Sequence, residues 1–261
     1  MSTVALTARD SSTMLRRNLL HARRYPSLTL NLLLTPIMLL LLFVYILGDA
    51  LGSGIGGGDR SDYLAYVVPG LLLMTIGSTV IGTAVSVSND MTEGIIARFR
   101  TMAIHRGSVL VGHVVGSVLQ SVLSVVLVGA VAVAIGFRST DAGVLDWLAA
   151  LGLLALFALA LTWIAVGMGL VSPNAEAASN NAMPLILLPL LSSAFVPLHA
   201  MPGWFQPIAE YQPFTPAIET LRGLLLGAQI GHNGWLAVGW CVGLAVLGYV
   251  WSTSRFDRDP A

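Results

Sequence analysis

The stretch from residue 147 to residue 170 reads Trp147-Leu-Ala-Ala-Leu-Gly-Leu-Leu-Ala-Leu-Phe-Ala-Leu-Ala-Leu-Thr-Trp-Ile-Ala-Val-Gly-Met-Gly-Leu170. It contains no charged residue, and it exceeds the ~20 apolar residues that a helix needs to cross about 30 Å of hydrocarbon. An apolar run of this length is typical of a transmembrane helix. It therefore predicts an all-α membrane protein, because an isolated segment can satisfy its backbone groups in lipid only as a helix.

The composition of the whole chain agrees with that prediction. Of 261 residues, 56% are hydrophobic and 10% are charged, and the mean hydropathy is +0.81. Soluble domains carry about 25% charged residues, so the expected solvent is lipid. The 13 basic and 13 acidic residues balance to a net charge of zero, which argues against a nucleic-acid partner.

Six stretches have the length and hydropathy of spans. The fifth of them contains three prolines, which predict a kinked or broken helix. The six predicted spans are Leu28–Leu47, Leu64–Ser88, Val109–Ile135, Trp147–Leu170, Ala182–Leu198 and Trp235–Ser252.

Six spans place both termini on one side of the membrane, and the arginines indicate which side. Ten of the 13 arginines lie in the N-terminal segment, the loop after the second span and the C-terminal tail. The loop around Ser172–Asn181 contains none. Positive residues favour the cytoplasmic side, so we expect a multi-pass protein of the cell membrane with both termini cytoplasmic. The three arginines on the other side are Arg60, Arg138 and Arg222.

The chain divides into residues 1–27 and a six-span domain, residues 28–261. Ser11 or Ser12 can begin a helix that ends at Tyr25, because Pro26 disfavours its continuation. Its apolar and basic faces predict an interfacial helix beside a cytoplasmic tail. An ordinary basic flank of the first span is the alternative.

Several kinds of chemistry are excluded by residue content. The chain has no Lys, so it has no P-loop and no Schiff-base lysine. Cys241 is its one cysteine and the five His form no H-x-x-x-H pair, so we expect no disulfide, no metal and no cofactor on this chain. Catalysis by this chain alone is not expected.

All acidic residues fall in loops or at predicted helix ends, so the spans offer only neutral polar groups. A proton-coupled carrier usually needs an intramembrane carboxylate, and this disfavours that class. The neutral groups either hold helices together or line a translocation path. The candidate path residues are Asn31, Thr35, Gln120, Ser192 and Phe195.

The loop between the second and third spans has an amphipathic pattern. Ile95, Phe99 and Met102 recur at helical spacing beside a polar face that includes Arg98. One interpretation is a second interfacial helix. The other is a cytoplasmic helix whose apolar residues dock into a groove on a soluble partner.

Three blocks resemble type-2 ABC transporter permeases, in particular the daunorubicin/doxorubicin-resistance membrane subunits. The first is Glu93-Gly-Ile-Ile-Ala-Arg-Phe-Arg100 followed by Arg106-Gly-Ser-Val-Leu-Val-Gly112. The second runs from Gly169 through Ser192-Ser-Ala-Phe-Val-Pro197, and the third from Met201-Pro-Gly-Trp204 to Leu221-Arg-Gly-Leu-Leu-Leu-Gly227. In that family a Pro usually stands where this chain has Ala103, and often an acid where it has Ala97.

The resemblance implies an exporter built from two permease subunits and two separate cytoplasmic ATPase subunits, which bind ATP and Mg²⁺. It places a coupling helix at the ATPase contact. The contact residues would be Glu93, Gly94, Arg98, Phe99 and Arg100.

The resemblance also implies short external helices over Pro197–Gly227 that partly re-enter the membrane before the last span, with Trp204, Phe214, Thr215 and Arg222 among their residues. Local signals agree, since Thr215 can cap a helix that ends at Gly227. A surface loop is the alternative, although it would expose many aromatic and Leu residues to water.

The favoured function is export of hydrophobic drug-like or lipid-like molecules, driven by ATP hydrolysis on another chain. Export of a glycan or glycolipid by the same machinery is the runner-up. A proton-coupled secondary carrier or a membrane scaffold belongs to another class.

Overall fold

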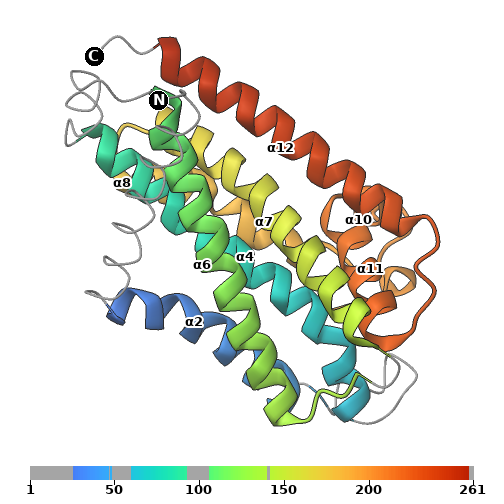
Figure 1. Ribbon diagram of the computed structural model, residues 1–261. Coiled ribbons are helices and arrows are strands. Elements are labelled where there is room, and N and C mark those ends of the chain that lie inside the picture. Colours follow the sequence, from blue (N-terminus) through green and yellow to red (C-terminus); the bar gives the residue numbers. More distant parts are fainter. Residues whose placement is uncertain (1–25, 47, 49–59, 93–105, 140–141, 259–261) are drawn as a thin grey trace.

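The computed structural model describes residues 26–46, 48, 60–92, 106–139 and 142–258 (Figure 1). Every regular element in these ranges is helical. In chain order they are α2 (Pro26–Leu41), the π-helix η1 (Leu42–Ile46), α4 (Arg60–Thr92), α6 (Arg106–Ile135), α7 (Val144–Val171), α8 (Ala175–Ala182), α9 (Pro184–Leu187), the 3₁₀ helices η2 (Leu188–Leu191) and η3 (Leu198–Ala200), α10 (Gln206–Tyr211), α11 (Phe214–Leu226) and α12 (Asn233–Arg258).

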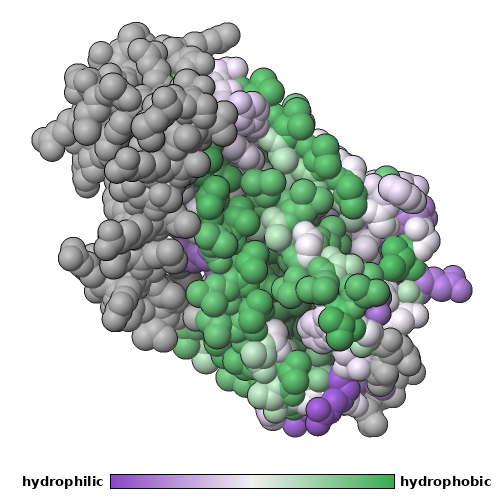
Figure 2. Space-filling view, in the orientation of Figure 1, coloured by the Kyte–Doolittle hydropathy of each residue, from purple (hydrophilic) through white to green (hydrophobic). Residues whose placement is uncertain are grey.

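Four of these helices, α4, α6, α7 and α12, are long and apolar enough to cross a membrane. Helix α4 is central, because 78% of its most apolar window is buried, compared with 28% in α6 and 17% in α12. The exposed side chains of α6 and α12 are largely apolar, and the outer surface is a broad hydrophobic face (Figure 2). In a bilayer such a face is solvated by lipid.

The predicted second, third, fourth and sixth spans are confirmed as continuous helices, each longer than expected. Where the first span was predicted, α2 carries Pro36 in its interior and passes directly into the π-helix η1. A Pro removes one i→i−4 hydrogen bond, and π-turns are a common irregularity within helices. In the part of the chain that the structure describes, the fold is therefore all-α with four span candidates, and the count of six spans stays a prediction.

The predicted fifth span is broken, as its prolines indicate. Its helical part also begins earlier than expected, since α8 occupies the stretch around Ser172–Asn181 that was expected to be a loop. The side chain of Asn174 caps α8 by accepting the Ala177 N–H at 2.8 Å. The segment then runs antiparallel to α4, with Leu185 against Gly77 and Ala194 against Gly70.

Helices α7 and α12 run parallel and touch most closely in their C-terminal halves. A Cβ atom on Gly248 would lie 2.8 Å from the backbone nitrogen of Ile164, and one on Gly167 would lie 2.4 Å from the Trp251 ring. The rings of Trp163 and Tyr249 meet edge to face at 5.0 Å. Small residues at these two positions allow the helices to approach.

Two predicted elements, the N-terminal interfacial helix and the coupling helix after residue 92, lie outside the described residues. The predicted external segment does form helices, α10 and α11, and Gly227 ends α11 in the left-handed conformation at φ 72°. The expected N-cap is wrong. Helix α11 begins at Phe214, and the Thr215 hydroxyl donates instead to the carbonyl of Ala209.

Candidate functional site

Arg222 is the centre of a buried polar cluster, although it lies on the apolar helix α11. Its side chain is 7% exposed. Nε and Nη2 donate to the Tyr66 carbonyl at 3.2 and 3.0 Å, and Nη2 also donates to the Ser193 carbonyl at 2.7 Å. Nη1 donates to Glu219 Oε1 at 2.6 Å and lies 3.4 Å from Ser193 Oγ. We call Tyr66, Ser193, Glu219 and Arg222 the Arg222 cluster.

The cluster joins three elements that are distant in sequence. Pro69 in α4 has no N–H for the helical bond to the Ala65 carbonyl, and Arg222 donates to the adjacent Tyr66 carbonyl. The guanidinium also lies 3.6 Å from the centroid of the Tyr66 ring, which adds a cation–π contact. Because the five N–H groups of an Arg match the five contacts, the buried charge is fully hydrogen-bonded.

Serine and threonine hydroxyls complete the surroundings of the cluster. Ser193 Oγ donates to Glu219 at 2.6 Å, and Thr215 Oγ1 accepts the Ser193 N–H at 3.3 Å. Tyr66 donates its own hydroxyl to the Ser193 carbonyl at 2.8 Å. The hydroxyl of Tyr63, one turn earlier in α4, is buried without a hydrogen-bond partner in the described part of the chain. The cluster therefore fixes α11 and the turn after η2 against α4.

A second set of polar groups crosses the interface of α4, α6 and α7. Thr79 and Ser121 are 2.6 Å apart, Thr83 donates to Ser117 at 2.6 Å, and Ser117 lies 3.3 Å from Thr162. All five side chains are buried. Hydrogen bonds between hydroxyls of neighbouring spans hold helices together. We call these five residues the seam; they join α4, α6 and α7 and do not form a free binding surface.

The seam ends in a buried pair, Asp90 and His113. Asp90 Oδ2 and His113 Nε2 are 2.9 Å apart, with side-chain exposures of 11% and 6%. Asp90 lies in the last turn of α4 and His113 in the second turn of α6. The pair thus joins the two helices on either side of residues 93–105, the segment of the predicted ATPase contact.

The predicted ATPase-contact residues Glu93, Gly94, Arg98, Phe99 and Arg100 lie outside the described residues. The candidate path residues are not gathered into one site. Thr35 is exposed on α2 and Gln120 half-buried on α6. Ser192 is buried, with its hydroxyl donating to Pro189, and Phe195 stacks on Phe43 at 4.4 Å. Asn31 lies in α2, and its side chain is outside what the structure describes.

The four residues of the predicted external segment separate into two groups. Trp204 is 76% exposed and contacts Phe205 edge to face at 5.5 Å. Phe214, Thr215 and Arg222 are buried, and Phe214 meets Phe157 of α7 at 5.0 Å. The inward group anchors α11 in the bundle, whereas Trp204 is free to meet lipid or a partner.

Sequence reasoning missed the partners of Arg222. It counted Arg222 on the external side of the membrane, in a re-entrant helix, without naming a partner. It also placed every acid in a loop or at a helix end, which is wrong for Glu219 in the middle of α11. The missed signal is the i,i+3 spacing of Glu219 and Arg222 in an apolar helix, because such charges are rarely buried unless paired.

Comparison with known proteins adds independent information. The family model described as ABC-2 type transporter matches residues 10–226. A daunorubicin resistance ABC transporter permease protein of Streptomyces coeruleorubidus is 30% identical, covering 82% of this chain and 74% of the relative. A probable doxorubicin resistance ABC transporter permease protein of Mycobacterium tuberculosis is 25% identical, covering 82% of this chain and 79% of that relative. Nodulation protein J of Rhizobium meliloti is 26% identical, covering 84% of this chain and 82% of that relative.

Proposed function

Because the chain belongs to the ABC-2 type transporter family, we propose that it is the membrane-spanning permease subunit of an ATP-driven exporter of hydrophobic drug-like or lipid-like molecules. The observation that carries the proposal is the match to a daunorubicin resistance permease along most of both chains. The apolar helices support a multi-pass membrane location.

The proposed motor is a separate ATPase subunit. The chain has no Lys and so no P-loop of its own. In the proposed assembly, two copies of the permease, or one copy and a close relative, combine with two ATPase subunits that bind ATP and Mg²⁺. In this proposal the segment 93–105 contacts the ATPase, and the Asp90–His113 pair holds together the two helices that flank the segment.

The proposed topology has six spans with both termini in the cytoplasm. The helix ends that the structure describes are consistent with the arginine distribution. Arg60 begins α4 and Arg138 follows α6, both on the proposed external side, whereas Arg255 lies near the end of α12 on the proposed cytoplasmic side. In this arrangement the broken segment α8–η2 is the fifth span, and α10 and α11 are the external helices. Asn31, Thr35, Gln120, Ser192 and Phe195 remain proposed path residues.

Transport by proteoliposomes tests the function. The permease is reconstituted with its cognate ATPase, and efflux of a lipophilic dye or an anthracycline is followed with ATP, without ATP, and with an uncoupler. We expect transport that requires ATP and survives the uncoupler, because the proposed path offers no titrating carboxylate. Transport that ignores ATP but stops with the uncoupler would indicate a secondary carrier.

Variants in the segment 93–105 test the partner. Arg98→Glu and Phe99→Asp should reduce co-purification of the ATPase by about 1–4 kcal/mol of binding free energy, the usual cost of losing an interface anchor. Arg138→Glu makes the same charge change at the proposed external end and should leave the ATPase bound. Equal recovery of the ATPase with all three variants would remove this segment from the interface.

A further inference from the structure

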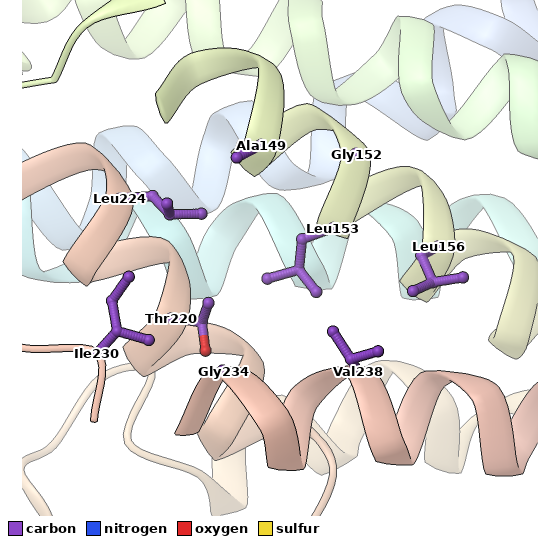
Figure 3. A pocket seen from close by; sticks show the side chains of 9 residues that line it. All are labelled: Ala149, Gly152, Leu153, Leu156, Thr220, Leu224, Ile230, Gly234 and Val238. Carbon is purple, nitrogen blue, oxygen red and sulfur yellow. The ribbon is translucent and has the colours of Figure 1, made fainter. Parts of the chain in front are cut away.

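A groove opens on the membrane-facing side of the bundle, between α7, α11 and α12. It has a volume of about 310 Å³. Figure 3 shows the side chains of Leu153, Thr220, Leu224, Ile230 and Val238 converging on this space. Ala149, Gly152 and Gly234 complete its lining with Leu156.

Helix packing explains the position of the groove. Helices α7 and α12 touch at Gly167 and Gly248, and they separate toward their N-terminal ends, where the end of α11 and Ile230 fill only part of the gap. Part of the groove wall there consists of glycines, which have no side chain. A Cβ atom on Gly152 would meet nothing within 4 Å.

The lining admits hydrocarbon and offers nothing to a polar ligand. Among the nine lining residues only Thr220 has a side-chain heteroatom, and its hydroxyl already donates to the Pro216 carbonyl at 2.7 Å. A ligand with hydroxyl or amide groups would lose their hydrogen bonds to water on entering. An alkyl chain would lose none.

The mouth of the groove has the features of a lipid headgroup region. Trp147 and Trp235 lie in the first turns of α7 and α12, and Trp is enriched where helices leave the hydrocarbon. Arg138 is exposed beside Ser139, whose hydroxyl donates to the Leu225 carbonyl at 2.6 Å, next to the lining residue Leu224. The nearby carboxylate of Asp146 is engaged by the Gly143 N–H.

We infer that this groove holds one acyl chain of a glycerophospholipid in the external leaflet, with the lipid phosphate at Arg138. Arg138, exposed just before α7, offers the phosphate a charge-assisted partner at the same end of the bundle, and the apolar walls complement the chain. The site is separate from the proposed export activity and needs neither ATP nor the ATPase.

Photolabelling tests the site. The full chain is placed in nanodiscs that contain phosphatidylglycerol with a diazirine on one acyl chain, and labelled peptides are mapped by mass spectrometry. We expect label concentrated on residues 149–156 and 234–238, relative to the exposed face of α6 around Leu119 and Leu123. Label spread evenly over both regions would mean ordinary annular lipid and would overturn the inference.

Two variants and a matched control sharpen the test. Gly152→Leu places its Cβ in open space and extends a side chain into the groove. It should reduce labelling about tenfold, because the filled space excludes the chain. Gly243→Leu adds the same side chain to open space on α12 and should leave labelling unchanged. Arg138→Gln should reduce labelling roughly fivefold through loss of a charge-assisted contact.

Other occupants give other results. If a second copy of the chain covers the groove, a cysteine at Val238 would form cross-links between copies and the wild-type groove would remain unlabelled. If the groove holds the transported molecule, an anthracycline would displace the label in proportion to its concentration. Either result would overturn the lipid site. A failure of drug export would not, because the labelling needs neither ATP nor the ATPase.

Discussion

At the scale of single residues, Arg222 shows how a charge is kept inside an apolar bundle. Its guanidinium has a carboxylate, two carbonyls, a hydroxyl and an aromatic face around it. A buried ion pair with all its hydrogen bonds made is roughly neutral in net stability, but removing one partner strands the other. The cluster therefore specifies the position of α11 in the bundle and adds little net stability.

Removal of Arg222 should be costly. We expect Arg222→Leu to lower stability by about 3–5 kcal/mol, because Glu219 and two carbonyls lose their donor. Glu219→Gln, which keeps an acceptor, should cost less, and the exposed Arg138→Leu should cost little. Thermal unfolding of the purified protein, followed by fluorescence-detected gel filtration, measures all three. Equal melting temperatures for Arg222→Leu and Arg138→Leu would contradict the cluster's role.

At the scale of elements, glycine and proline determine which helices approach and which break. Glycines at 167 and 248 bring α7 and α12 into contact, and those at 70 and 77 admit the broken segment against α4. Pro184 is the first residue of α9 and Pro189 is the second residue of η2, the two short helices of that segment. Glycine thus determines where these helices pack closely, and proline determines where the broken segment begins its short helices.

Closing the space at Gly248 should separate α7 from α12. A Cβ there would lie 2.8 Å from backbone and side-chain atoms of α7, so Gly248→Val should cost about 1–3 kcal/mol through overpacking. The matched control is Gly243→Val, on the same helix but facing open space. Melting temperature and the monodisperse fraction after purification provide the comparison, and an equal loss in both variants would contradict the close packing.

At the scale of the whole molecule, the helices are arranged as an apolar-surfaced bundle around α4 (Figures 1 and 2). The α4–α6 pairings from Thr79–Ser121 to Asp90–His113 run in opposite directions along the two helices, as consecutive spans require. The C-terminal end of α4 therefore lies beside the N-terminal end of α6. Gly169 of α7 lies against Ala84 and Val87 of α4, and α7 runs parallel to α12, so the C-terminal end of α12 lies at this same end of the bundle.

Thiol labelling in intact cells should establish which end faces the cytoplasm. In a Cys241→Ser background, single cysteines at Ser2 and Ser254 should resist a membrane-impermeant reagent, whereas one at Gly56 should react. Cys241 is itself buried, so the wild-type chain serves as a low-labelling control. Reaction of both terminal positions from outside would invert the proposed orientation.

The sequence by itself determined the fold class, four of the long helices and the break in the fifth predicted span. These follow from local properties: an apolar run of sufficient length needs no partner to form a helix in lipid, and each proline removes a backbone hydrogen bond, so the three prolines of the fifth predicted span break it. The motif blocks likewise led to a family that the comparisons confirm. The residues of the proposed ATPase contact remain a prediction from sequence.

Tertiary structure alone decided what the polar residues do. Thr215 was expected to cap its own helix and instead joins α10 to the turn after η2. Arg222 was expected in an external re-entrant helix, and only the structure shows that it bonds to Tyr66, 156 residues away. Hydropathy and helical period describe one segment at a time, so they cannot show which distant carbonyl a buried cation will meet. The groove between α7, α11 and α12 also depends on how far apart these helices lie, and no single segment of the sequence determines that separation.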